Sequence, residues 1–161
     1  MKNSRALCVL CVLFTIGVVH ADESLDAFFP QSSIVISAGS NACYRFDIHV
    51  ATNDRQRQRG LMFVRHMDDW RGMLFVYPDD GMYSMWMKNT FIPLDMLFIR
   101  ADGTISSVSP DTEPQSLKSV ASIEDVRYVL ELNAGISKRL GIGAGDRMYW
   151  SGDLKPPASE N

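Results

Sequence analysis

The apolar residues of this chain fall into short runs divided by turn-forming residues, and this spacing predicts a mainly β fold. Residues 44–50 alternate apolar and polar side chains, the pattern of a strand with one buried and one exposed face. Residues 72–77 and 95–100 are apolar on both faces and are predicted to be buried strands, the first of them central in its sheet. At hairpin-length spacings, about eight strands and two short helices predict an antiparallel sandwich or a closed barrel.

The two helices are predicted from their end signals. The first is capped by Thr52 or Asn53, runs through Arg59 and stops at Gly60, because glycine is favoured just past a helix end. The second is predicted over residues 134–140, directly before a last short strand.

A tight turn and a further strand are predicted to follow the central strand. Residues 78–81 read Pro-Asp-Asp-Gly, in which proline presets φ and glycine allows a positive φ. Residues 83–88 are then expected to form a strand whose alternate side chains face opposite ways. One face would carry Tyr83, Met85 and Met87, and the other Ser84, Trp86 and Lys88.

Residues 1–21 have the features of a secretory signal peptide. A short basic start precedes an apolar run over residues 6–19, and Val19-His20-Ala21 supplies small residues for a signal peptidase. The run is shorter than the ~20 residues that span a bilayer, so a retained anchor is the less favoured alternative. The sequence predicts a periplasmic or secreted protein with an N-terminal tail (22–32), one domain (33–151) and a C-terminal tail (152–161).

Charge and cysteine content limit the partners and the means of stabilisation. The formal net charge is −3, and because a nucleic-acid-binding surface needs a basic face, no nucleic acid is expected as a partner. Once the signal peptide is removed, Cys43 is the only cysteine, so no intramolecular disulfide can form. The domain is therefore expected to be stabilised by its hydrophobic core, for which its length is sufficient.

A polar corner inside an apolar stretch is the strongest candidate for a functional site. Residues 82–99 are mainly apolar, yet they contain Lys88, Asn89, Thr90 and Asp95. Burying a polar group without a partner costs roughly 2–7 kcal/mol. These side chains must therefore bond to one another or open on a cleft.

Five short motifs in this chain, in this order, resemble those of domain-of-unknown-function family 192. The likeness covers about residues 34–150 and implies a compact, mainly β domain of sandwich-like form, common in secreted bacterial and archaeal proteins. The family is uncharacterised in function, so the resemblance implies no activity. The motifs are Arg59-Gly60-Leu61-Met62, Gly72-Met73-Leu74-Phe75, Trp86-Met87-Lys88-Asn89-Thr90, Pro93-Leu94-Asp95 and Leu130-Glu131-Leu132-Asn133-Ala134-Gly135.

The polar residues of this corner fit two interpretations, a ligand-binding site or a hydrogen-bonded structural corner. A tryptophan beside a lysine, an amide and a hydroxyl is typical of a site for a small polar ligand, such as a sugar or a peptide end. Asn and Thr side chains also bond local backbone readily, so a purely structural corner remains open. We favour non-catalytic binding in a cleft by Trp86. The candidate residues are Trp86, Lys88, Asn89, Thr90, Asp95, Arg59 and Glu131.

Hydrogen-bond partners can be predicted for two of these residues. Arg59 is expected to pin its helix to the sheet through a buried acid, either Asp95 or Glu131. Asp95 follows the bend that Pro93 imposes, and antiparallel return of the chain would bring it near residues 88–90. Asp95 is therefore expected to accept hydrogen bonds from residues 89–90 or from Arg59.

Two other functions remain open, an extracytoplasmic enzyme and a copper carrier. No motif positions or activates Cys43 or Ser84 as a nucleophile, so no catalytic residue is assigned. Met85 and Met87, together with a histidine such as His49, are soft ligands of the kind that suit Cu(I). Methionine is far commoner in hydrophobic cores, so no metal and no cofactor are predicted.

Secretion of the full chain is expected to yield a protein that begins at Asp22, because the basic start, apolar run and small residues specify cleavage after Ala21. N-terminal sequencing of the exported protein measures this directly. An intact Met1 on the exported chain would contradict both the cleavage and the localisation inferred from it.

Overall fold

The computed structural model describes residues 21–39 and 42–155, with side chains from residue 25 onward. All of the predicted signal peptide except Ala21 lies outside this part, as does the end of the predicted C-terminal tail. None of the helices in the described part is long and apolar enough to cross a membrane.

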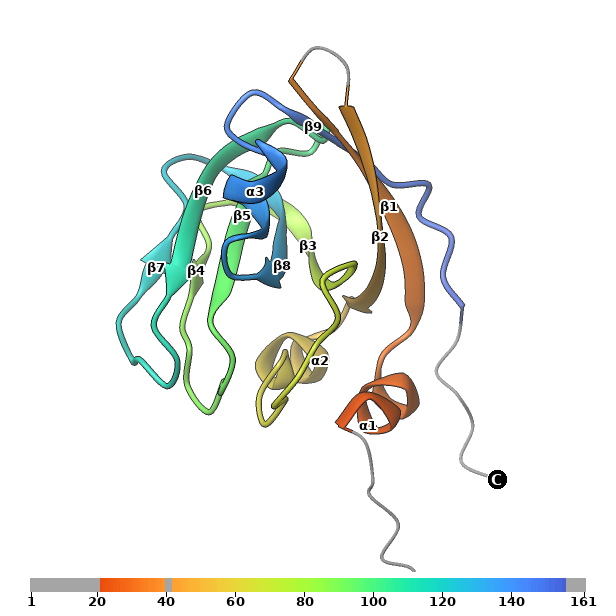
Figure 1. Cartoon of the computed structure of the whole chain (residues 1–161), viewed down its shortest axis with the longest axis vertical. Coiled ribbons are helices and arrows are strands. Elements are labelled where there is room, and N and C mark those ends of the chain that lie inside the picture. The colour runs from red at the N-terminus through yellow and green to blue at the C-terminus, as the bar shows by residue number, and fades with distance from the viewer. Residues whose placement is uncertain (1–20, 40–41, 156–161) are drawn as a thin grey trace, which may run out of the picture.

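Strands dominate the described part of the chain, which holds nine strands and three short helices (Figure 1). In chain order they are α1 (Ala21–Phe28), β1 (Gln31–Ala38), β2 (Ala42–Ala51), α2 (Asp54–Arg59), β3 (Arg71–Gly81), β4 (Ser84–Met85), β5 (Leu94–Ile99), β6 (Ile105–Thr112), β7 (Val120–Ala121), β8 (Val126–Asn133), α3 (Ile136–Leu140) and β9 (Arg147–Tyr149). The predicted mainly β class is confirmed.

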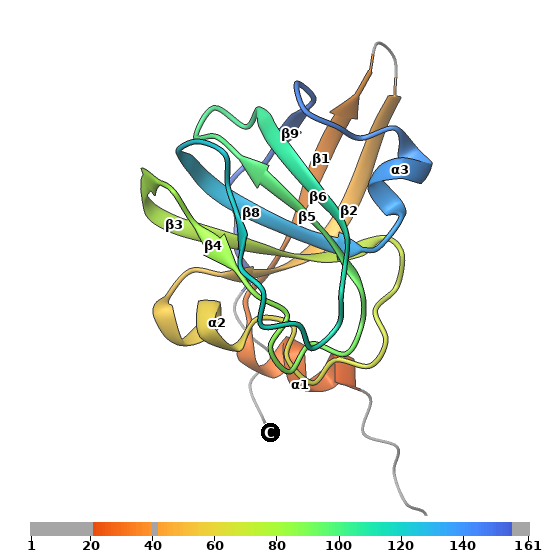
Figure 2. The ribbon, with the colours of Figure 1, turned by 90° about the vertical axis from the view of Figure 1, so that its left-hand side faces the viewer.

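Seven of the strands form one curled sheet in the order β6-β5-β8-β3-β2-β1-β9, with β3 at its centre as predicted. Figures 1 and 2 show the sheet bending round on itself, with α1 and α2 at one end, and α3 packs against β6 and β8. The strands β4 and β7 form a separate two-stranded sheet.

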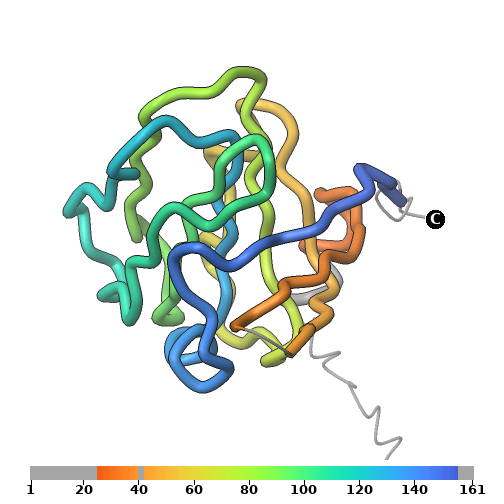
Figure 3. Tube along the Cα trace, turned by 90° about the horizontal axis from the view of Figure 1, so that it is seen from above, coloured from red at the N-terminus to blue at the C-terminus, as the bar shows by residue number. Residues whose placement is uncertain are grey.

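The curled sheet is a half-barrel, so the predicted closed barrel is wrong. Its two edges approach each other only where the turn after β5 meets β9, through an isolated bridge between Thr104 and Arg147. Gly103 makes this approach possible, because a Cβ at this position would lie 2.3 Å from the Met148 carbonyl oxygen. Figure 3 shows the same approach from above, where the segment that carries β9 runs past the other edge of the sheet.

The prediction of an antiparallel sheet is right for most pairs and wrong for one. The strands β2 and β3 are parallel, with Ile48 opposite Gly72 and Val50 opposite Leu74. Parallel neighbours need a crossover connection. Residues 52–70, which include α2, supply it and carry the chain across one end of the sheet.

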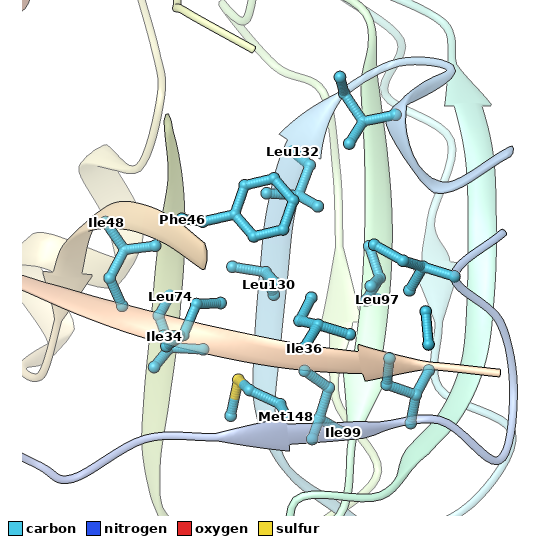
Figure 4. Packing of buried hydrophobic residues seen from close by; sticks show 14 of the residues in the cluster. Ile34, Ile36, Phe46, Ile48, Leu74, Leu97, Ile99, Leu130, Leu132 and Met148 are labelled. Carbon is cyan, nitrogen blue, oxygen red and sulfur yellow. The ribbon is translucent and has the colours of Figure 1, made fainter. Parts of the chain in front are cut away.

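The two faces of the sheet bury separate hydrophobic cores. The inner core takes residues from all seven strands, and Figure 4 shows Ile36, Ile99 and Met148 brought together inside the curl. The outer core lies on the other face and includes Met73, Phe75 and Met96, with residues of α1 and of the segments flanking β4 packed over them. Because side chains alternate along a strand, neighbouring residues of β5 and β8 enter different cores.

The expected N-terminal tail is instead part of the folded domain. Helix α1 covers residues 21–28, and Leu25 and Phe29 are buried in the outer core. The buried His49 ring of β2 lies 2.6 Å from the Asp26 carboxylate, measured from Nε2 to Oδ1. The helix spans only eight residues, too few for a clear periodic apolar pattern in the sequence.

Two local predictions after the central strand also need correction. Residues 78–81 are not a separate tight turn, because β3 continues through them to Gly81 with an irregularity in its pairing with β8. The predicted strand 83–88 shortens to Ser84–Met85. The alternation of faces still holds, because Met87 is buried while Trp86 and Lys88 are exposed.

Candidate functional site

A cavity of about 240 Å³ lies between α2, the end of β3, β4, the segment 86–90 and β8. Five of the seven predicted site residues line it, although they come from three distant parts of the sequence. Its lining is Asp54, Arg57, Gln58, Arg59, Gly60, Leu61, Met62, Phe75, Tyr77, Ser84, Met85, Trp86, Lys88, Thr90 and Glu131. Asn89 and Asp95 are the two predicted residues that do not line it.

One wall of the cavity is α2 and the loop that follows it. The helix starts at the predicted cap, where the Asn53 side chain accepts a hydrogen bond from the Gln56 backbone N–H at 3.0 Å. It ends at Gly60, whose φ of 42° suits glycine and whose missing Cβ would lie 3.2 Å from the Phe75 ring. The close approach places Arg59 at the cavity.

Arg59 is held by its own loop and not by a buried acid, so the predicted pairing with Asp95 or Glu131 is wrong. Its Nη1 donates to the backbone carbonyls of Gly60 and Met62. Its guanidinium carbon lies 5.4 Å from the centre of the Phe63 ring. Burial lowers the pKa of Arg59.

The opposite rim carries Trp86 and Lys88, as the sequence predicted. The Trp86 side chain is half exposed, and the Lys88 ammonium nitrogen lies 5.0 Å from the centre of its ring. Thr90 is buried below them, and its hydroxyl is 3.4 Å from the Lys88 carbonyl oxygen. The rim therefore offers an aromatic surface with a cation against it.

Glu131 lies at the inner end of the cavity, on the outer-core face of β8. It pairs with Met73 on one neighbouring strand and with Met96 on the other, and both methionines are fully buried. The residue is 4% exposed, and no hydrogen bond or ion pair of its carboxyl group is found within the described part of the chain. No side-chain nitrogen or oxygen of that part is both fully buried and unbonded, so the carboxyl group of Glu131 opens on the cavity that it lines. Burial raises the pKa of Glu131 to about 8, so the group holds its proton at neutral pH.

Tyr77 is a wall residue that sequence reasoning missed. Its ring stacks on Tyr83 with centroids 3.5 Å apart, and its hydroxyl donates to the Met85 sulfur at 3.3 Å. Burial, and next the nearby Glu131, raise the pKa of Tyr77 to about 12. Its alternation with Phe75 along β3 was visible in the sequence, but the pairing of β3 with β8 that brings both into one cavity with Glu131 was not.

Asp95 is a structural anchor on the inner face, and its predicted donors are wrong. The buried carboxylate accepts hydrogen bonds from the backbone N–H groups of Asp111, Gly135 and Ser137 at 2.9–3.1 Å, and from the Ser137 hydroxyl at 2.6 Å. It thus joins β5 to the end of β6 and to the start of α3. Asn89 turns the chain with a φ of 57°, and its side-chain nitrogen lies 3.9 Å from the Met62 sulfur.

The side chains considered as copper ligands each bond to a different residue of the protein. The Met87 sulfur, in the outer core, accepts a hydrogen bond from the Thr112 hydroxyl at 3.3 Å, whereas the Met85 sulfur is bonded to Tyr77. His49 is paired with Asp26 on another part of the sheet. Within the described residues, no group of three or more His, Cys, Asp or Glu side chains could hold a metal ion.

A second hollow of about 370 Å³ lies over β1 and β2, and three of the charged or titratable side chains that line it are paired. The Arg45 and Asp47 side chains bond to each other at 2.8 Å. His49, which also lines it, is paired with Asp26. Only the cavity beside Trp86 contains a buried carboxyl group without a partner in the described part.

Fold and cavity together define a β domain built on an open half-barrel, with one small cavity against the outer face of the sheet. The chain belongs to the DUF192 family, described as "Uncharacterized ACR", whose model matches residues 34–150. This match confirms the family that the sequence motifs indicated. No curated protein matches the chain.

The solved structures that resemble this one include proteins from two organisms. A protein of Sinorhizobium meliloti 1021, described as a "putative transcription regulator", is 41% identical with a TM-score of 0.76, covering 78% of this chain and 97% of that one. A protein of unknown function from Novosphingobium aromaticivorans DSM 12444 is 27% identical with a TM-score of 0.72, covering 79% and 96%.

Replacing Asp95 by alanine is expected to destabilise the domain by about 3 kcal/mol, because three N–H donors and one hydroxyl lose their acceptor in a buried place. Urea unfolding followed by circular dichroism measures the loss. The control is Asp68→Ala, which removes a carboxylate that is 72% exposed. Equal effects of the two substitutions would contradict the anchoring role of Asp95.

The pKa of Glu131 makes stability depend on pH. Between its ordinary value of 4.5 and about 8, the unfolded chain releases a proton that the folded chain keeps, so the free energy of unfolding falls as pH rises. Relative to Glu131→Gln, the loss is expected to be about 1.4 kcal/mol per pH unit within this window. Chemical unfolding of the wild type and of Glu131→Gln across this pH range measures the effect. The prediction is contradicted if the free energy of unfolding changes with pH in the same way for both proteins.

Proposed function

We propose that this domain is an extracytoplasmic, non-catalytic binding module that holds a small polar ligand in the cavity beside Trp86. The observation that carries the proposal is the Glu131 carboxyl, buried and without a partner in the described residues, at the inner end of a cavity with charged and aromatic walls. This carboxyl group opens on the cavity, because no fully buried side-chain oxygen of the described part is left unbonded. A ligand in the cavity could supply the hydrogen-bond partner that the described residues do not.

The composition of the walls supports a ligand that is small and partly polar. Phe75, Tyr77 and Met85 supply apolar surface, whereas Arg59, Lys88 and Thr90 supply polar groups. A few polar groups set among apolar and aromatic side chains are the usual composition of small-molecule sites. The volume of about 240 Å³ is below the usual range, which favours a ligand the size of one sugar unit or one amino-acid residue.

The regulator description of the Sinorhizobium protein is not extended to this chain. Regulators that read DNA through a helix need a basic surface and a helix long enough to lie in a groove. This chain has a net charge of −3, and the longest helix in the described part is α1, with eight residues and three acidic ones. A small-molecule site is the better-supported function.

The test is a ligand screen of the chain beginning at Asp22. Saturation-transfer NMR with a panel of monosaccharides, disaccharides, amino acids and dipeptides is expected to detect at least one binder that is lost in Trp86→Ala. The matched control is Trp70→Ala, because Trp70 has the same exposed fraction of 50% and lies outside the cavity.

Trp86→Ala is also expected to cost less stability than the ~3–5 kcal/mol of a buried aromatic truncation, because half of its side chain is exposed. A loss of stability as large as that of a buried aromatic truncation would instead identify Trp86 as a packing residue. Binding that is unchanged in Trp86→Ala, or no binder in the whole panel, would overturn the proposed function.

A further inference from the structure

The cavity has two ends of different electrical character. At the inner end, Glu131 sits between Met73 and Met96, and burial raises its pKa to about 8. At the outer end, the ammonium nitrogen of the exposed Lys88 lies 5.0 Å from the centre of the Trp86 ring, and no ion pair of Lys88 is found within the described part. A buried, protonated acid and an exposed cation without an ion pair in the described part therefore line one small cavity.

The other charged groups around the cavity do not alter this difference between Glu131 and Lys88. Arg57 is matched by Asp54, whose carboxylate lies 2.5 Å from its guanidinium. Arg59 uses one nitrogen for its own loop and has no acidic partner among the described residues. The titratable and charged side chains that line the cavity are Asp54, Arg57 and Arg59 from α2, Tyr77 from β3, Lys88 from the segment after β4, and Glu131 from β8.

We propose that the ligand is a small zwitterion, a free α-amino acid or a dipeptide, whose ammonium group pairs with Glu131 and whose carboxylate lies by Lys88 and Arg59. This inference rests on the proposed function and names its ligand class. Such a ligand places a cation at the end that lacks one and an anion at the end that has unpaired cations. Its size matches a cavity of about 240 Å³.

The alternatives satisfy only one end. A carboxylate without an amine could accept a hydrogen bond from protonated Glu131, but its own charge would be buried where no cation lies near. A neutral sugar could bond to Glu131 and stack on Trp86, but it would leave the outer cations without a counter-charge. A zwitterion satisfies both ends in one molecule.

Binding of an ammonium group next to Glu131 is expected to release a proton. Before binding, Glu131 holds its proton at pH 7, and a cation against it favours the ionised carboxylate. The Glu131 O–H bond breaks, the proton passes to solvent and the ligand ammonium keeps all of its own. About one proton is therefore released for each zwitterion bound.

The experiment is isothermal calorimetry on the chain beginning at Asp22, with the twenty standard amino acids and glycylglycine as probes. The tightest binder is then compared with its N-acetyl derivative, which lacks the ammonium, and with its carboxamide, which lacks the carboxylate. Heats measured in phosphate and in Tris at pH 7 give the number of protons released.

The expected result has three parts. The N-acetyl derivative binds at least tenfold more weakly than the parent probe. Glu131→Gln abolishes proton release, whereas Glu124→Gln, which alters a carboxyl group outside the cavity that is bonded to Arg100, leaves it intact. Lys88→Gln weakens binding of the parent probe and leaves binding of the carboxamide unchanged, because only the parent has a carboxylate for Lys88 to meet.

Failure of this inference can be told apart from failure of the proposed function. A sugar that binds in a Trp86-dependent manner, with no amino acid or dipeptide binding, overturns the zwitterion and leaves the binding function standing. Equal affinity for the N-acetyl derivative, or no proton release, also overturns it. Absence of every binder in both panels overturns both. Circular dichroism of each variant excludes unfolding as the cause of a lost signal.

Discussion

The buried carboxylate of Asp95 is the interaction on which one end of the fold depends. It sits on β5 and bonds to β6 and to the start of α3, segments separated from it by up to 42 residues. Since Gly135 and Ser137 lie at the start of α3, one side chain satisfies backbone donors that a five-residue helix would otherwise leave open.

Glu131 presents the opposite case on the neighbouring strand. The residue paired with Asp95 is Leu132, and the residue paired with Glu131 is Met96, so the two acids point to opposite faces of the same pair of strands. Asp95 is surrounded by donors, whereas Glu131 is surrounded by methionines and opens on a cavity. Two acids at the same depth thus have different roles, because a satisfied acid stabilises a fold and an unsatisfied one is a cost that function can explain.

The sequence predicted the class of fold and the cavity rim better than it predicted connections. Apolar runs and turn signals located most strands, and the Asn53 cap and Gly60 stop located α2, because these signals are local. The parallel pairing of β2 with β3 and the open sheet could not be read, since pairing depends on contacts between distant segments. Trp86, Lys88 and Thr90 are close in the sequence and line one cavity. The partners predicted for Arg59 and Asp95 were wrong, because Arg59 bonds to its own loop and Asp95 bonds to distant segments. Tyr77 and Phe75 were missed because β3 is apolar on both faces, so the sequence does not show which of its side chains face a cavity.

The position of β9 in the sheet affects how the chain folds during synthesis. Val35 near the start of the domain pairs with Tyr149 near its end, so the sheet acquires its last edge strand only when nearly the whole chain is available. Until then β1 has an open edge, and such edges are prone to pairing with other chains. A nascent chain would pass through this exposed stage at every round of synthesis. The interval between completing β8 and completing β9 is therefore the time during which a holding partner or rapid release would matter most to its yield.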